Sequence, residues 1–326
     1  MLVFGKGYNS LKKKYIVPLS RHRVKYSSIS KNSVKNEIGS GKNNDFRIDG
    51  NEYIFVFSED ILFVQLADSW KTYIRAALQY DAARKIGCMT PDICPNWDIV
   101  SDYYYAYYCA STILRFCLRG TMYLDATTIG TINGIITEVI GALTNLPNGN
   151  NFDYKLRQSE DGVNLYELVI KKSNGQTHET VWNSIKDLLI EVREESSKDS
   201  DEYTILSSLI RILNKLDATF PSRLRNEVNY QLKYGMLALE KKIYPSRACE
   251  GKRGNWLGPI LLYDGKNQTL EKRIELFRAY TEYLHTLMLN LVYEYDTIQG
   301  GTGITKALNK YRTLQIDIPK GYYNYD

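Results

Sequence analysis

The sequence predicts a mostly α-helical protein: a helical bundle with small inserted β-hairpins and a basic N-terminal arm. Long segments after residue 67 repeat apolar residues at helical spacing. Only two short segments alternate apolar and polar residues around an Asp-Gly pair, which is typical of hairpins. The chain has 326 residues, more than the roughly 100–200 of one domain. We therefore expect one large domain with appendages.

The first 47 residues form the expected basic arm. They carry eleven Lys or Arg against Glu37 and Asp45, a net charge of +9, whereas the whole chain is +5 and the remainder therefore −4. Such an arm can follow a nucleic-acid backbone, because neutralising phosphates releases counterions. The candidate RNA-binding residues of the arm are Lys12, Lys13, Lys14, Arg21 and Arg23. The alternative is a solvated, partly disordered leader rich in Lys, Ser and Asn.

A short β element is expected at residues 48–66, where aromatic residues alternate after Asp49-Gly50. The helical domain then spans residues 67–298. Its first helix runs from Ser69 to a terminating Gly87, with Tyr and Ala at helical spacing.

The second predicted helix covers residues 98–120 and ends at Gly120. A third helix is expected near residues 128–145 despite its glycines. The second hairpin is an insertion at about residues 152–174, with its turn at Asp161-Gly162.

Four amphipathic helices follow, up to residue 296, and Ser222 after Pro221 is the expected N-cap of the third. Residues 299–326 form a polar C-terminal tail. Repeats of a solenoid period are absent from the sequence.

Composition excludes several classes of protein. The sequence has no apolar run near the roughly 18 residues that cross a bilayer, and no N-terminal secretory pattern. The five cysteines form no C-x-x-C pair and the three histidines lie far apart in the sequence. We therefore expect a cytoplasmic protein with reduced thiols, no metal site, no cofactor and no membrane association.

Two helices carry the functional motifs. Residues 100–120 contain the paired tyrosines YYYAYY followed by a leucine-containing turn. On packing grounds alone such an aromatic face more often belongs to a core. About a hundred residues later, Arg225-Asn226-Glu227-Val228-Asn229-Tyr230 follows Arg223. Leu224 and Val228 share one helix face, which leaves Arg225 and Asn229 as a neighbouring polar pair.

Together and in this order, the two segments resemble the HEPN domain family, whose members act on RNA in toxin–antitoxin and phage-defence systems. The resemblance implies a catalytic helix in which an arginine and a polar residue precede a histidine. Here Arg225 and Asn226 match, and Tyr230 stands where the family has histidine. An unperturbed tyrosine, with a pKa near 10, is a weak general base at neutral pH.

The resemblance implies that Arg225, Asn226 and Tyr230 act on the scissile phosphate, without a metal ion, and that Arg223 and Asn229 help to bind RNA. It also implies a homodimer or a larger complex with a partner protein of the same defence or toxin–antitoxin system. The alternative for these residues is a structural polar network in which Arg225 pairs with a carboxylate.

We therefore expect an RNA-directed HEPN-like effector or effector subunit, with metal-independent endoribonuclease activity. Two other functions stay open. One is a non-catalytic HEPN-like module that binds a partner protein or a nucleotide. The other is a structural nucleic-acid-binding protein that acts through its basic arm.

Overall fold

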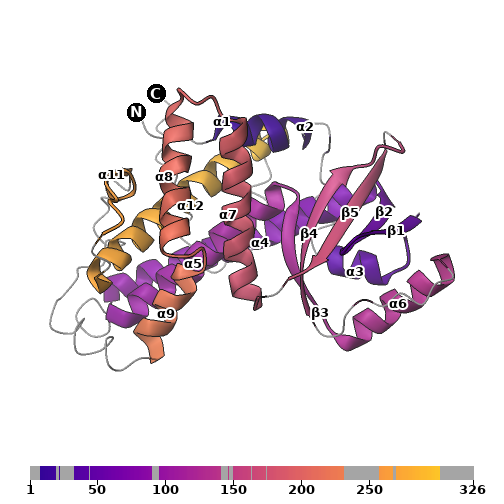
Figure 1. The fold of residues 1–326 in the computed structure, drawn as a ribbon, viewed down its shortest axis with the longest axis horizontal. Helices are drawn as coiled ribbons and strands as arrows, with labels where there is room; N and C mark the ends of the chain where they lie inside the picture. The colour runs from indigo at the N-terminus through magenta and orange to yellow at the C-terminus, as the bar shows by residue number, and fades with distance from the viewer. Residues whose placement is uncertain are drawn as a thin grey trace.

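Figure 1 shows the computed structural model of the protein. The structure describes residues 8–19, 22, 33–43, 45–89, 95–140, 146, 150–162, 164–173, 175–230, 257–266 and 269–301. A group of long helices lies on one side of the molecule and a β-sheet on the other (Figure 1).

The sheet has five antiparallel strands in the order β1-β2-β5-β4-β3. The two predicted hairpins supply four of them. The hairpin at Asp49-Gly50 is β1 (Asp45–Asp49) with β2 (Glu52–Ser58), and Gly50 has the positive φ of +57° that its turn requires. The second hairpin is β4 (Asn150–Gln158) with β5 (Leu165–Lys172).

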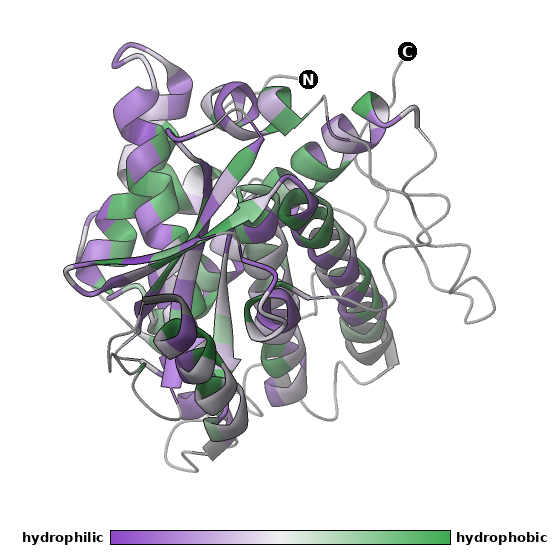
Figure 2. Cartoon of the chain, turned by 90° about the vertical axis from the view of Figure 1, so that its right-hand side faces the viewer, coloured by the Kyte–Doolittle hydropathy of each residue, from purple (hydrophilic) through white to green (hydrophobic). Residues whose placement is uncertain are grey.

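The predicted fold class is therefore wrong: the protein has an α+β fold, not a helical bundle with small hairpins. Strand β5 explains why the hairpins do not stay separate. Its residues 166–170 are all buried, so both of its faces and both of its edges need neighbours. An isolated two-stranded hairpin leaves apolar faces in water and is marginally stable at best. Pairing β2 with β5 joins the hairpins into one sheet, and Figure 2 shows apolar residues along the middle of its strands.

The fifth strand, β3 (Arg119–Leu124), lies where the sequence predicts the end of a helix. Helix α5 (Pro95–Phe116) stops before Gly120, and Leu118 takes the positive φ of 56° that glycine was expected to supply. Gly120 instead pairs with Tyr154 of β4. An L-residue can hold this left-handed conformation at modest cost when the surrounding contacts fix it.

Helix α5 is central to the helical side. It packs against α4 (Asp60–Met89), α12 (Leu270–Ile298), α7 (Thr177–Glu195) and α9 (Phe220–Tyr230). Helix α12 is buried along most of its length, since seventeen of its residues have no more than marginal solvent contact. None of the described helices combines the length and the apolar composition needed to span a bilayer.

The remaining helices surround this group. Helix α8 (Asp201–Lys215) packs on α7 and on the short α11 (Leu257–Leu261). Helix α7 also contacts β3 and β4, which links the helices to the sheet, while α3 (Val34–Gly39) and α6 (Ala126–Ile140) contact each other near β1. Residues 9–19 form one continuous helical segment, labelled α1 (Asn9–Leu11), η1 (Lys12–Ile16) and α2 (Val17–Leu19).

Candidate functional site: an arginine and a histidine on the tyrosine face of α5

Helix α9 presents Arg225 to α5. Leu224 and Val228 are buried, as their spacing predicts, and fix the orientation of the helix. The predicted N-cap is wrong, because α9 begins at Phe220 and Ser222 lies inside it. The hydroxyl of Ser222 is 2.9 Å from the hydroxyl of Tyr103 on α5. Ser222 therefore ties the two helices together beside Arg225.

The guanidinium of Arg225 rests on two tyrosine rings of α5. Its Cζ lies 4.9 Å from the ring centroid of Tyr103 and 5.9 Å from that of Tyr104, and Nη1 donates to the Tyr104 hydroxyl at 3.3 Å. These are cation–π contacts, which hold a guanidinium without neutralising its charge.

Within the described part of the chain, Arg225 has no carboxylate partner, and its buried Nε has no hydrogen-bond acceptor. The neighbouring Glu227 instead binds Arg273 of α12 through two hydrogen bonds of 2.6 and 2.8 Å. The described residues thus do not contain the structural network in which a carboxylate neutralises Arg225. A half-buried arginine without a counter-ion is suited to bind an anion.

His178, in the first turn of α7, lies against the same tyrosines. Its ring stacks on Tyr107 at a centroid distance of 4.4 Å and an interplanar angle of 27°. Its Nδ1 is 2.8 Å from the Tyr103 hydroxyl, and its ring meets Tyr104 edge-on at 6.2 Å. Tyr103 and Tyr104 therefore contact both His178 and Arg225.

The environment keeps the imidazole neutral. Burial, reinforced by the positive charge of Arg225, lowers the pKa of His178 below its usual value of 6.5. Tyr103 can accept a hydrogen bond from Nδ1 and donate its own proton to Ser222. In that tautomer Nε2 carries a free lone pair and can act as a base.

The other motif residues lie apart from this site. Asn226 and Asn229 are exposed. Arg223 is exposed too, donates to the carbonyl of Leu216 and lies 3.7 Å from Asp217, so it covers the C-terminal end of α8. Tyr230 ends α9, and its side chain lies outside the described residues.

Two of the three lysines in the helical segment of residues 9–19 pair with carboxylates. Lys12 pairs with Glu294 of α12, and Lys14 pairs with Glu191 at 2.6 Å and with Glu195, both on α7. Lys13 is exposed, and Arg21 and Arg23 lie outside the described residues. Lys12 and Lys14 thus hold this segment on the helical group.

Sequence reasoning missed His178. The HEPN resemblance directs attention to a histidine within the arginine-bearing helix, whereas His178 is on a different helix that only the tertiary fold brings near. Its position beside the start of an amphipathic helix was the only available clue. Among the described residues, no group of three or more His, Cys, Asp or Glu side chains is arranged to hold a metal ion.

Comparisons with known proteins give no family for this chain: no family model, no curated protein and no solved structure matches it.

Proposed function

We propose that this protein is an RNA-directed effector of the HEPN type, in which His178 of α7 takes the part of the histidine absent from α9. The single observation that carries the proposal is the half-buried Arg225, which has no carboxylate partner among the described residues and shares Tyr103 and Tyr104 with a neutral histidine. An RNA phosphodiester can supply the anionic partner that Arg225 does not have among the described residues.

The chemistry follows from the two side chains. Arg225 would bind a non-bridging phosphate oxygen and stabilise the charge that develops there. Nε2 of His178 would accept the proton of the neighbouring ribose 2′-hydroxyl, whose oxygen then bonds to phosphorus while the bond to the 5′-oxygen breaks. The imidazolium would return its proton to the leaving 5′-oxygen. The products are a 2′,3′-cyclic phosphate and a 5′-hydroxyl.

Tyr103 would serve as a positioning residue in this scheme. Its hydroxyl lies between Nδ1 of His178 and Oγ of Ser222, so it fixes the rotation and the tautomer of the imidazole. Removing only that hydroxyl should therefore change the pH profile of cleavage more than the affinity for RNA.

The experiment is cleavage of end-labelled RNA by the purified full chain in the presence of a chelator. The variants are Arg225→Ala, His178→Gln and Tyr103→Phe, with Arg211→Ala as the matched control, because Arg211 is an exposed arginine of α8. We expect cutting by the wild type and the control, with cyclic-phosphate ends, and a loss of about 10²-fold or more in Arg225→Ala and His178→Gln.

Cleavage that survives in both variants would contradict the proposed site. A different result would contradict only the catalytic role: the wild type binds RNA, Arg225→Ala weakens that binding, and no variant cuts the RNA. The protein would then be a non-catalytic module that binds a nucleotide or RNA.

A further inference from the structure

A cavity of about 190 Å³ opens beside His178, between α4, α5, β3 and the start of α7. Its eleven lining residues include Arg75 and Arg115, two tyrosines and several hydroxyl side chains, and none of them is acidic. Ligand pockets for whole small molecules usually measure about 300–1,000 Å³. This cavity is therefore suited to an anionic, hydrogen-bonding group that is part of a longer ligand.

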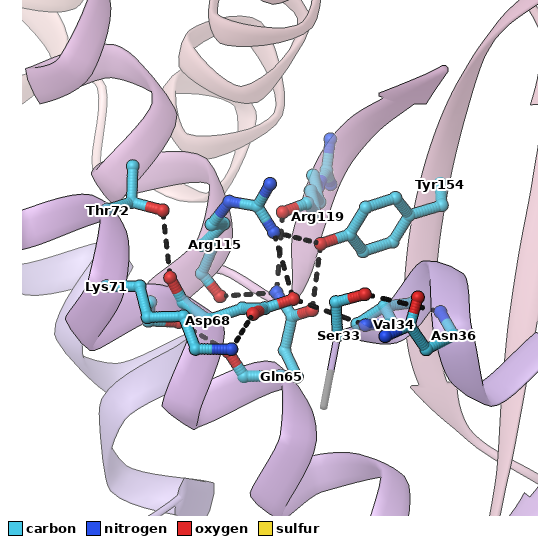
Figure 3. A network of polar contacts seen from close by, with 11 residues as sticks. Ser33, Val34, Asn36, Gln65, Asp68, Lys71, Thr72, Arg115, Arg119 and Tyr154 are labelled. Atoms are coloured by element: carbon cyan, nitrogen blue, oxygen red, sulfur yellow. Dashed lines mark hydrogen bonds and ion pairs between the residues drawn. The ribbon is translucent and has the colours of Figure 1, made fainter. Parts of the chain in front are cut away.

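Arg115 lines this cavity, and a network of polar contacts holds it in place (Figure 3). Its Nη1 donates to the Tyr154 hydroxyl at 3.0 Å and lies 3.6 Å from the Asp68 carboxylate. The Tyr154 hydroxyl donates to Gln65 at 2.9 Å, and the amide of Gln65 donates in turn to the Arg115 carbonyl at 2.8 Å. The guanidinium is thus oriented before any ligand arrives, which lowers the cost of binding.

Arg75 lies on the cavity's α4 side and is exposed. No carboxylate among the described residues pairs with it. Asp68 partly offsets the charge of Arg115, so Arg75 is the cavity's main attraction for anions from solvent and Arg115 adds oriented hydrogen-bond donors.

The cavity and the Arg225–His178 site adjoin one another. Tyr107 lines the cavity and stacks under His178, and Thr177, next to His178 in the chain, lines the cavity as well. Between residues 103 and 115, α5 is buried except for one half-buried stripe at helical spacing, made of Tyr104, Tyr107, Tyr108, Ser111 and Arg115. This α5 stripe connects the two sites.

From Tyr104 to Arg115 the stripe covers eleven helical steps, or about 16 Å at about 1.5 Å per residue. A stacked single strand advances about 3.4 Å per base, so this length corresponds to at most about five nucleotides. Aromatic rings between cationic ends are the usual surface for single-stranded nucleic acid, because bases stack on the rings and phosphates pair with the cations.

We infer that the cavity is a second phosphate subsite and that the α5 stripe binds a single-stranded RNA segment, with one phosphate at Arg225 and another at Arg75 and Arg115. The inference rests on the proposed function, because it extends the ligand of the Arg225–His178 site. It implies that the affinity for RNA rises once the strand is long enough to reach both Arg225 and the cavity at Arg75 and Arg115.

The test is binding of fluorescein-labelled 2′-O-methyl oligonucleotides, which cannot be cut by attack of a 2′-hydroxyl, measured by anisotropy with the full chain. A dinucleotide reaches one subsite and a six-nucleotide strand reaches both. The variants are Arg75→Ala, its charge-conserving counterpart Arg75→Lys, and Arg225→Ala, with Arg211→Ala as the control. Arg75 is preferred to Arg115 because its exposed side chain supports no buried network.

We expect Arg75→Ala to weaken the six-nucleotide strand about fivefold in 0.1 M salt, the electrostatic contribution of one phosphate contact, and to reduce the salt slope by about 0.7. Arg75→Lys should keep that slope, and Arg75→Ala should weaken the dinucleotide less than the six-nucleotide strand, because the dinucleotide can still bind at Arg225.

Equal effects of Arg75→Ala on both lengths, or no effect on either, would overturn the second subsite. If Arg225→Ala still weakens binding in that case, the proposed function stands without it. If Arg225→Ala changes the affinity for neither length, the proposed function itself fails, whatever Arg75 does.

Discussion

Gly120→Ala tests how the sheet supports the cavity. Gly120 of β3 faces Tyr154 of β4, and a Cβ at position 120 would lie 2.6 Å from Cε1, Cζ and the hydroxyl oxygen of Tyr154. Atoms cannot stay that close, so the ring must move. The ring is not free to do so, because its buried hydroxyl binds Gln65 at 2.9 Å and Arg115 at 3.0 Å.

The magnitude has two parts. Overpacking a well-filled interior costs about 1–3 kcal/mol. Separating the Tyr154 hydroxyl from its two partners costs about 1–3 kcal/mol more, because a buried polar group without a hydrogen bond has lost its solvation and gained nothing in return. We expect Gly120→Ala to lower the free energy of unfolding by about 2–6 kcal/mol, the sum of the two costs, and Tyr154→Phe alone to lower it by about 1–3 kcal/mol.

Urea denaturation followed by circular dichroism measures both variants and the double variant. Because both substitutions act on the same hydroxyl, the double variant should lose less than the sum of the two single losses, by about 1 kcal/mol or more. Gly120→Ala should also weaken six-nucleotide binding, since Arg115 loses an anchor. Additive losses, or an unchanged Gly120→Ala, would refute the link from Gly120 through Tyr154 to Arg115.

Three titrating groups give further predictions for the free energy of unfolding, all measured by urea titrations at several pH values. Because burial and Arg225 lower the pKa of His178, the wild type should lose stability as the pH falls below the unfolded value of about 6.5. His178→Gln should remove that loss, and an identical acid dependence in the variant would contradict the lowered pKa. Burial, reinforced by Asp187, raises the pKa of Asp153 to about 6, so the charged form costs stability at neutral pH. Asp153→Asn should stabilise the protein by about 1–2 kcal/mol above pH 6 and by nothing at pH 3, where both states are protonated. Burial opposes ionisation of Glu191, but hydrogen bonds from Lys14 and Arg119 outweigh it and lower its pKa to about 2. Glu191→Gln should therefore cost about 1–3 kcal/mol at pH 7, a difference that must shrink as the pH falls from 4.5 toward 2.

Local patterns predicted the individual elements better than their assembly. The Asp-Gly turns of both hairpins, the buried face of α9 and a helix near residues 128–145, observed as α6 (Ala126–Ile140), are confirmed, because turn chemistry and helical periodicity are local properties. The five-stranded sheet was not predicted, since the pairing of β2 with β5 joins segments more than a hundred residues apart. Alternation within a strand does not identify its partner.

The boundary of α5 shows a second limit. Glycine is the usual residue just after a helix, so Gly120 was the natural end point. The left-handed position is occupied by Leu118, and Gly120 is needed because Tyr154 leaves no room for a side chain. From the sequence alone, Gly120 could equally end a helix or leave space for a side chain on a neighbouring strand. Only the position of β4 shows that the second requirement applies.

The candidate site shows the same division. Arg225 follows from the motif, while its partners Tyr103, Tyr104 and His178 come from two other helices. The sequence shows the five tyrosines of α5 as a cluster. Which of them are buried and which are half-buried depends on the packing of α4, α7 and α12 around α5.

The lysines of the N-terminal segment (residues 9–19) attach it to the helical group and lie far from the candidate site. Glu195, which binds Lys14, lies seventeen helical steps along α7 from His178, about 25 Å at about 1.5 Å per residue. At a Debye length of about 10 Å in 0.1 M salt, a lysine that far away contributes little to binding at Arg225.

Deleting residues 1–47 is therefore a poor test of RNA recognition by a basic arm. Leu11, Ile16 and Leu19 are almost fully buried, and exposing such side chains costs about 1.5–3 kcal/mol each. The deletion would also leave Glu191 and Glu195 without Lys14 and remove three of the five residues of β1 from the sheet edge. We expect the shortened protein to unfold at markedly lower urea concentration, so a loss of RNA binding in it would report instability, and the distinction between arm and site must come from point variants at Arg75 and Arg225.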